Sequence, residues 1–137
     1  MGTGSPNIVG VVSIKAESQG FALGTTSDTS LLTVSDNKTI KINNIIVANV
    51  HGTNSSTIDI KVTKENYTSD GVVNTDTSGT FHLAKNVSVA TGSSLVVLDT
   101  PIYLMEFTGG TGDILKAKAS VASVLEVFVS YEVLDDA

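Results

Sequence analysis

Residues 43–62 read NNIIVANVHGTNSSTIDIKV, two apolar runs of strand length joined by the polar stretch HGTNSST. The second run, at 57–63, alternates cleanly, because Ile58, Ile60 and Val62 are separated by threonine, aspartate and lysine. Strict alternation predicts a β-strand with one buried face and one solvated face. This stretch therefore indicates a β protein.

The first run is part of a longer strand predicted at 39–50, TIKINNIIVANV. A continuous period of two places Ile45 and Val47 on one face. The opposite face would carry Ile40, Ile42, Ile46, Ala48 and Val50. The second half of the strand is then apolar on both sides, which fits a central strand covered by a loop or by another subunit.

Three asparagines interrupt this apolar strand: Asn43, Asn44 and Asn49. Their amides can satisfy backbone groups of a loop or of a neighbouring chain. An edge contact to another subunit is one explanation for them, and a covered bulge is another.

Six further segments combine apolar or β-branched residues with flanking turn residues: 8–16, 30–34, 80–90, 94–105, 114–120 and 125–133. Together with the two runs above they make about eight strands, and no segment shows a helical period. Many short strands with regular turns favour an all-β fold. We expect an antiparallel β-sandwich, jelly-roll-like or immunoglobulin-like, as a single domain at 17–137. Residues 1–16 are expected to form a flexible N-terminal arm with the first strand.

Patterns within these segments predict faces and connections. In 80–90 the expected inward residues are Phe81, Leu83, Val87 and Val89, and in 125–133 they are Leu125, Val127, Val129, Tyr131 and Val133. Pro101 interrupts the segment 94–105 and predicts a bend or a switch of sheet. The segments 114–120 and 125–133 are expected to form a hairpin. Residues 64–80 make the longest polar connection, residues 35–38 read as a tight turn, and 21–23 is too short to assign as a strand.

Charge and composition exclude several classes of protein. The chain has 137 residues, a net charge of −6 and no cysteine. Its cations do not cluster, which argues against nucleic-acid binding. No apolar stretch approaches the ~18 residues of a membrane span, and the N-terminus lacks the pattern of a signal peptide.

The sequence offers no recognisable catalytic or metal-binding motif. The two histidines are His51, at a loop entrance, and His82, on the polar side of a predicted strand. No nucleophile elbow accompanies them, and the carboxylates lack the spacing of a calcium loop. The glycine-rich stretch at 109–112 has no helix after it to receive a phosphate. We therefore expect no enzyme activity, no cofactor and no metal.

Three longer stretches carry a resemblance: INNIIVANVHGTNSSTIDIKV (42–62), FHLAKNVSVATGSSLVVLDTPIYL (81–104) and GDILKAKASVASVLEVFVSYEVL (112–134). Their order and spacing resemble small β-sandwich virion structural proteins of tailed bacteriophages, of the type found in marine and cyanobacterial phages. The resemblance spans about three quarters of the chain, residues 38–134. It implies a protein of the virion, assembled in the cytoplasm of a bacterial host.

The resemblance implies partners in place of substrates: the major capsid protein or other virion proteins, and further copies of the chain. Virion parts follow point-group symmetry, so homotrimers or hexamers are expected, and we favour the homotrimer. The residues expected at a subunit interface lie in the doubly apolar strand and near the apolar edge at 102–105: Asn43, Asn44, Ile45, Val47, Asn49, Ile102, Tyr103 and Met105. Both regions could equally be covered by loops of the same chain.

The leading expectation is a capsid decoration, or cement, protein. A neck, tail or fibre component of the same particle is the alternative, and a carbohydrate-binding module for host attachment is a third. Sugar platforms usually need exposed aromatic rings. Only Tyr67 lies in a predicted loop, whereas Tyr103 and Tyr131 are expected to be structural.

Overall fold

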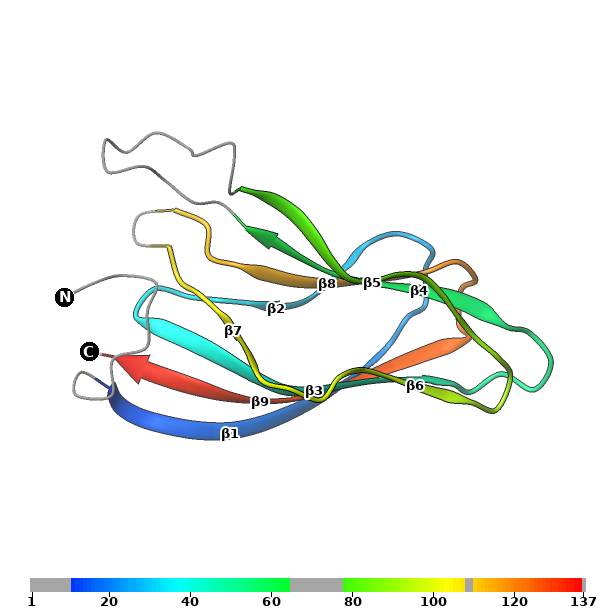
Figure 1. The fold of residues 1–137 in the computed structure, drawn as a ribbon, viewed down its shortest axis with the longest axis horizontal. Coiled ribbons are helices and arrows are strands. Elements are labelled where there is room, and N and C mark those ends of the chain that lie inside the picture. Colours follow the sequence, from blue (N-terminus) through cyan, green and yellow to red (C-terminus); the bar gives the residue numbers. More distant parts are fainter. Residues whose placement is uncertain (1–10, 65–77, 108–109, 137) are drawn as a thin grey trace.

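The computed structural model describes residues 11–64, 78–107 and 110–136, and these form strands and connections without a helix (Figure 1). The strands are β1 (Val11–Ala22), β2 (Thr29–Thr33), β3 (Lys38–Asn49), β4 (Ser56–Lys64), β5 (Gly79–Val89), β6 (Ser94–Leu98), β7 (Ile102–Leu104), β8 (Ile114–Ala119) and β9 (Leu125–Asp136). Within this part of the chain no helix is long and apolar enough to cross a membrane.

The strands form two antiparallel sheets that face each other as the two layers of a sandwich (Figure 1). Sheet A has the order β1-β9-β3-β6, with β7 also paired to β3, and sheet B has the order β2-β8-β4-β5. The pairs are nested along the chain: β1 with β9, β2 with β8, β3 with β6 and β7, and β4 with β5. Nested pairs divided between two layers are the strand order of a jelly roll. The predicted all-β sandwich is confirmed, in its jelly-roll form.

Strand β1 runs across the predicted boundary between the N-terminal arm with the first strand and the rest of the domain. The predicted boundary between an arm at 1–16 and a domain at 17–137 falls inside β1, which pairs with β9 from Ser13 to Ala22 without interruption. The short segment 21–23 is the end of this strand and its continuation. The prediction of a flexible arm at 1–10 lies outside the described residues.

A β-bulge in β3 overturns the predicted faces of that strand. The register with β9 shifts between Ile42 and Asn44, so the alternation changes sides at that point. Before the bulge Ile40 and Ile42 point into the core, and after it Ile45 and Val47 do so, with no exposed surface. An extra residue on one strand reverses every later side chain. The predicted face running through Ile46, Ala48 and Val50 is therefore wrong, because those residues turn outward.

The strands on either side of the core mostly follow their sequence pattern. In β4 the side chains of Ile58 and Ile60 are fully buried, as the alternation predicted. In β9 the inward row was also predicted correctly: Leu125, Val127, Val129 and Tyr131 are buried, and Val133 packs against the core.

Strand β5 departs from its predicted face at two irregularities. Its register with β4 shifts on both sides of Ile60, and Ala84, not Leu83, lies opposite that residue. The prediction that Leu83 points inward is wrong, because Leu83 falls in a bulge and is exposed. Phe81 pairs with Val62 but is 48% exposed, since β5 is the edge of sheet B.

The connections around β6 to β9 include one correct and one wrong prediction. Both β6 and β7 pair with β3, so Pro101 marks a bend in a strand that keeps its neighbour. The predicted hairpin of 114–120 with 125–133 is wrong, because β8 belongs to sheet B and β9 to sheet A.

The tight turn predicted at 35–38, between β2 and β3, is confirmed by a hydrogen bond of 3.2 Å from Lys38 N to Ser35 O.

Candidate interaction surfaces

Asn49 is a buried structural residue. Its Nδ2 donates to the carbonyl oxygens of Asn54 (2.9 Å) and Val89 (3.0 Å), and its Oδ1 accepts from the backbone N–H of His51 (2.9 Å). The ring of His51 continues this network, since Nδ1 accepts from the N–H groups of Thr53 and Asn54. The polar stretch after β3 is therefore held by one amide and one imidazole, which gives both side chains a structural role.

The other two asparagines belong to the bulge. Asn43 Nδ2 donates to Glu132 Oε2 at 3.0 Å, and Asn44 lies opposite Ser130 in β9. Both side chains are half-buried. Of the two explanations left open by the sequence, a bulge accounts for their position.

The structure divides the residues that were predicted to contact another subunit. Ile45, Val47 and Asn49 are buried within the chain, so their side chains are not available to a partner. The others have exposed surface: Tyr103 is exposed, and Asn43, Asn44, Ile102 and Met105 are half-buried. Contact of these five with a partner stays a prediction. Of the two tyrosines expected to be structural, Tyr131 is buried and Tyr103 is not.

An apolar row, which we call the apolar stripe, crosses the outer face of sheet A. Four residues lie side by side on adjacent strands: Gly20 opposite Phe128, Phe128 opposite Ile46, and Ile46 opposite Val96. Phe128 is 48% exposed and Val96 is 54% exposed. The ring of Phe128 lies over Gly20, where a Cβ would be 3.5 Å from the ring atom Cδ1. The stripe thus presents an aromatic and two aliphatic side chains to the outside.

A hollow of about 340 Å³ lies beside the apolar stripe. The next row of the sheet consists of Ala22, Glu126, Ala48 and Ser94, whose side chains are short apart from that of Glu126. The hollow forms because these small side chains lie next to the large side chains of Phe128 and Ile46. A protruding side chain of another protein can fill such a hollow while packing against the exposed apolar side chains beside it.

Sequence patterns missed the apolar stripe. Phe128 stands among Glu126, Ser130 and Glu132 on the side of the last strand that alternation assigns to solvent. A large aromatic on a polar face was a usable signal. Gly20, Ile46 and Val96 could be joined to it only once the register of three strand pairs was known.

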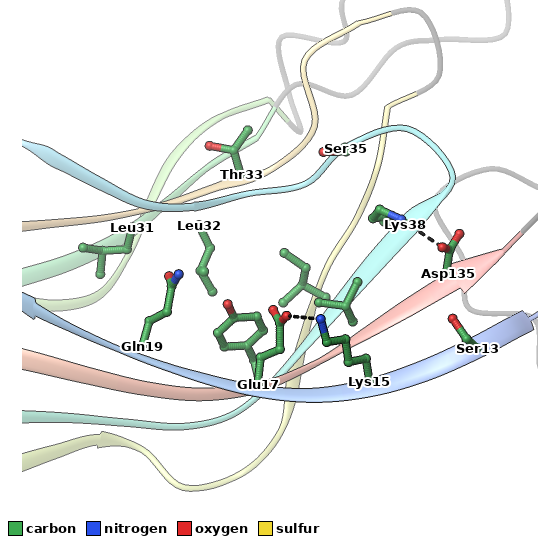
Figure 2. A pocket seen from close by; sticks show the side chains of 13 residues that line it. Ser13, Lys15, Glu17, Gln19, Leu31, Leu32, Thr33, Ser35, Lys38 and Asp135 are labelled. Carbon is green, nitrogen blue, oxygen red and sulfur yellow. Dashed lines mark hydrogen bonds and ion pairs between the residues drawn. The ribbon is translucent and has the colours of Figure 1, made fainter.

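A second hollow, a cleft of about 510 Å³, lies between the edge strands β1 and β2 (Figure 2). Side chains from β1 line one wall and Leu31 and Leu32 of β2 line the other. Two ion pairs lie in it, Lys15 Nζ to Glu17 Oε1 at 3.1 Å and Lys38 Nζ to Asp135 Oδ2 at 3.0 Å. The cleft therefore has a charged rim and an apolar side.

Two groups in this cleft have shifted pKa values. The hydrogen bond from Lys15, followed by one from Tyr131, holds the pKa of Glu17 below its usual value. Burial, followed by the hydrogen bond to Glu17, raises the pKa of Tyr131. These shifts stabilise a carboxylate and a neutral phenol. Neither is a proton donor or acceptor poised near neutral pH, and no histidine is among the described residues that line the cleft.

Elsewhere in the described chain, no three histidine or acidic side chains gather in a way that could hold a metal ion. His82 is exposed on β5, opposite Lys61. In the described residues, the two surface features that stand out on this jelly-roll domain are the apolar stripe and the cleft between β1 and β2.

Comparison with known proteins adds no family assignment. No protein-family profile matches the chain, and no curated protein matches it. Among solved structures, it is similar to the VP2 subviral particle of infectious bursal disease virus, with 13% identity, a TM-score of 0.43, and coverage of 92% of this chain and 33% of that chain. It is also similar to a Bacillus endospore appendage from a family of disulfide-linked pili, with 10% identity, a TM-score of 0.42, and coverage of 91% and 90%.

The chain spans about a third of the VP2 chain that it matches. At these TM-scores neither similarity bears on function. The jelly-roll assignment rests on the strand order of this chain itself.

Proposed function

We propose that this chain is a structural subunit of a tailed-bacteriophage particle, a decoration (cement) protein that binds the major capsid protein on the head. The observation that carries the proposal is the apolar stripe, which none of the described residues covers. The resemblance of residues 38–134 to phage virion proteins supports it, and so does the jelly-roll fold, which is frequent in viral capsid domains. Since lectin domains share the fold, the surface carries more weight than the topology.

The outer face of sheet A has the size and shape of a protein–protein interface. Four strands about 4.8 Å apart and twelve residues of β9 at about 3.4 Å each give a face of about 800 Å². That is the area one partner contributes to a standard protein–protein interface, about 800 Å². Its centre is apolar, and Glu126 and Glu132 lie on the same face, where Glu132 already pairs with Lys41 at 3.7 Å. The partner surface that fits would present an apolar side chain to the hollow and a lysine or arginine beside Glu126.

In this proposal the protein has no enzymatic activity and no cofactor, and it works by association in the virion. Partners are other virion proteins and further copies of the chain, with neither nucleic acid nor membrane among them. The homotrimer expected from virion symmetry stays a prediction. The neck, tail or fibre position and the glycan-binding module are outcomes of the test below. Tyr67, on which the glycan alternative depends, lies outside the described residues.

The test is co-sedimentation of the purified protein with tail-free expanded phage capsids. The Phe128→Asp variant places a charge in the centre of the apolar stripe and should abolish sedimentation while leaving the fold intact. Phe81→Asp is the matched control, because Phe81 is also 48% exposed but lies on the edge of sheet B. It should sediment like the unchanged protein.

Three results would contradict the proposal. Failure of the unchanged protein to bind heads would exclude the cement role, and binding to isolated necks or tails would support the alternative position in the virion. Binding that Phe128→Asp leaves intact would exclude the apolar stripe as the docking surface. A glycan-array signal lost on Tyr67→Ala would favour the attachment module.

A further inference from the structure

Strand β1 is the one unprotected edge among the four edges of the two sheets in the described structure. Sheet edges end at β1, at β6 and β7, at β2, and at β5. The edge of β6 and β7 is interrupted at Pro101, β2 is short and bulged, and β5 carries two irregularities and a left-handed Asn86 (φ 52°). Bulges, proline and short length are devices that prevent an edge from pairing with another chain. By contrast, β1 pairs regularly with β9 over ten residues, from Ser13 to Ala22, and no other strand of the described residues lies along its other side.

Two charged residues on β1 would ordinarily count as such a protective device. Lys15 and Glu17 lie two residues apart, so both point to the same side of the sheet, and both line the cleft. Inward charges on an edge strand discourage pairing because the added strand would have to bury them. Here the charges are opposite in sign and accessible, with 74% of the Lys15 side chain and 33% of the Glu17 side chain exposed.

The order of these charges is complementary to itself. An antiparallel copy of β1 related by a two-fold axis at Ala16 places Lys15 opposite Glu17 of the second copy, and Glu17 opposite its Lys15. Opposite charges directly across a strand pair are stabilising, and like charges are destabilising. Two-fold registers centred on residue 15 or residue 17 would place like charges opposite each other. The charge pattern therefore selects the register centred on Ala16.

We propose that the free edge of β1 pairs with β1 of a second copy of this chain, antiparallel and centred on Ala16, so that sheet A continues across a two-fold axis. The pairing covers residues 13–19 of each copy and forms two reciprocal Lys15–Glu17 contacts. The same charges reject strands that lack the complementary order, which makes the contact specific. The clefts between β1 and β2 of the two copies then open towards each other.

This contact does not depend on the proposed function, because it concerns only copies of the chain. A two-fold axis joins copies in pairs, so the assembly contains an even number of chains. A dimer has a mass of about 28 kDa, twice the 14.2 kDa of one chain. A trimer would require a different contact, such as one through the apolar stripe, and two trimers joined through β1 would make a hexamer.

The test is a set of charge exchanges measured by light scattering and analytical ultracentrifugation over a dilution series. Lys15→Glu gives acidic residues at both positions, and Glu17→Lys gives basic residues at both. Each variant alone should dimerise at least about tenfold more weakly than the unchanged protein. An equimolar mixture of the two should form dimers again, because each supplies the charges that the other lacks. The double variant Lys15→Glu/Glu17→Lys should dimerise like the unchanged protein.

Lys85→Glu is the control, because Lys85 lies on β5, an edge strand whose irregularities prevent pairing, and this variant should not change the oligomeric state. Circular dichroism checks that every variant is folded. A folded unchanged protein that is a monomer or an isolated trimer at all concentrations would overturn the proposal. So would a mixture of the two single variants that stays monomeric, or loss of the dimer with Phe128→Asp but with neither charge change. Capsid binding is measured separately, so failure of one proposal is distinguishable from failure of the other.

Discussion

Replacing Asn49 by alanine should be among the most destabilising single polar substitutions in this protein. The side chain is buried and makes three hydrogen bonds, at 2.9, 3.0 and 2.9 Å, to the backbone of Asn54, Val89 and His51. Each such bond contributes about 1 kcal/mol net, and an unpaired buried partner adds to the loss. Asn49→Ala should therefore lower the free energy of unfolding by about 3 kcal/mol. For a chain of this length that corresponds to a fall in Tm of about 10 °C.

Two companion variants separate the hydrogen bonds from the loss of side-chain volume. Asn49→Asp keeps the acceptor for His51 N but loses both donors and turns a carboxylate towards two carbonyl oxygens. It should be at least as destabilising as alanine. Asn43→Ala removes one half-buried bond, to Glu132, and should cost less than about 1 kcal/mol.

The assay is urea unfolding at neutral pH, followed by circular dichroism, with the Tm measured alongside. The expected order of stability is the unchanged protein, then Asn43→Ala, then Asn49→Ala, then Asn49→Asp. The reasoning is refuted if Asn49→Ala lies within about 0.5 kcal/mol of the unchanged protein, the range typical of surface substitutions. It is equally refuted if Asn43→Ala costs as much as Asn49→Ala.

Two further predictions concern backbone packing and pH. Gly112→Ala should lower the free energy of unfolding by about 2 kcal/mol, because a Cβ there would clash with the carbonyl oxygen of Val34. Gly24→Ala, where a Cβ would have nothing within 4 Å, is the control and should be nearly neutral in urea unfolding. Burial and the hydrogen bond to Glu17 raise the pKa of Tyr131 above the usual value of a tyrosine, about 10. The neutral phenol therefore stabilises the fold below about pH 10, and that stabilisation is lost as the pH rises through the raised pKa. Tyr131→Phe should therefore lose less stability than the unchanged protein between about pH 9 and pH 11, and an identical loss in both proteins would contradict this.

The fold was predictable wherever a strand keeps a strict period of two. The alternation around Ile58 and Ile60 fixes the buried face of β4, and the alternation from Leu125 to Tyr131 does the same for β9. In both strands local pattern and tertiary burial agree, so a single sequence is enough. The turn at 35–38 was also predictable from the sequence, because Ser, Asp and Asn favour turns locally.

The errors occurred where one residue changes the period or where a connection crosses between layers. Nothing local distinguishes Asn43 as a bulge from Asn43 in a regular strand, since the shift is measured against β9, more than 80 residues away. The two irregularities in β5 could not be predicted for the same reason, because they are defined by its register with β4. The connection from β8 to β9 is short enough for a hairpin, and only the pairing of both strands with other partners shows that it joins the two sheets.

The bulge in β3 links these errors to the surface that carries the proposed function. In a regular strand Ile45 and Val47 would point outward, and they were accordingly predicted to contact another subunit. The extra residue exchanges them with Ile46 and Ala48. Ile46 then lies between Phe128 and Val96, and Ala48 forms part of the adjacent hollow. The bulge at Asn43 and Asn44 thus shapes the outer surface as well as the core. It brings one large and one small apolar side chain to the outer face of sheet A, where Ile46 becomes part of the apolar stripe and Ala48 part of the adjacent hollow.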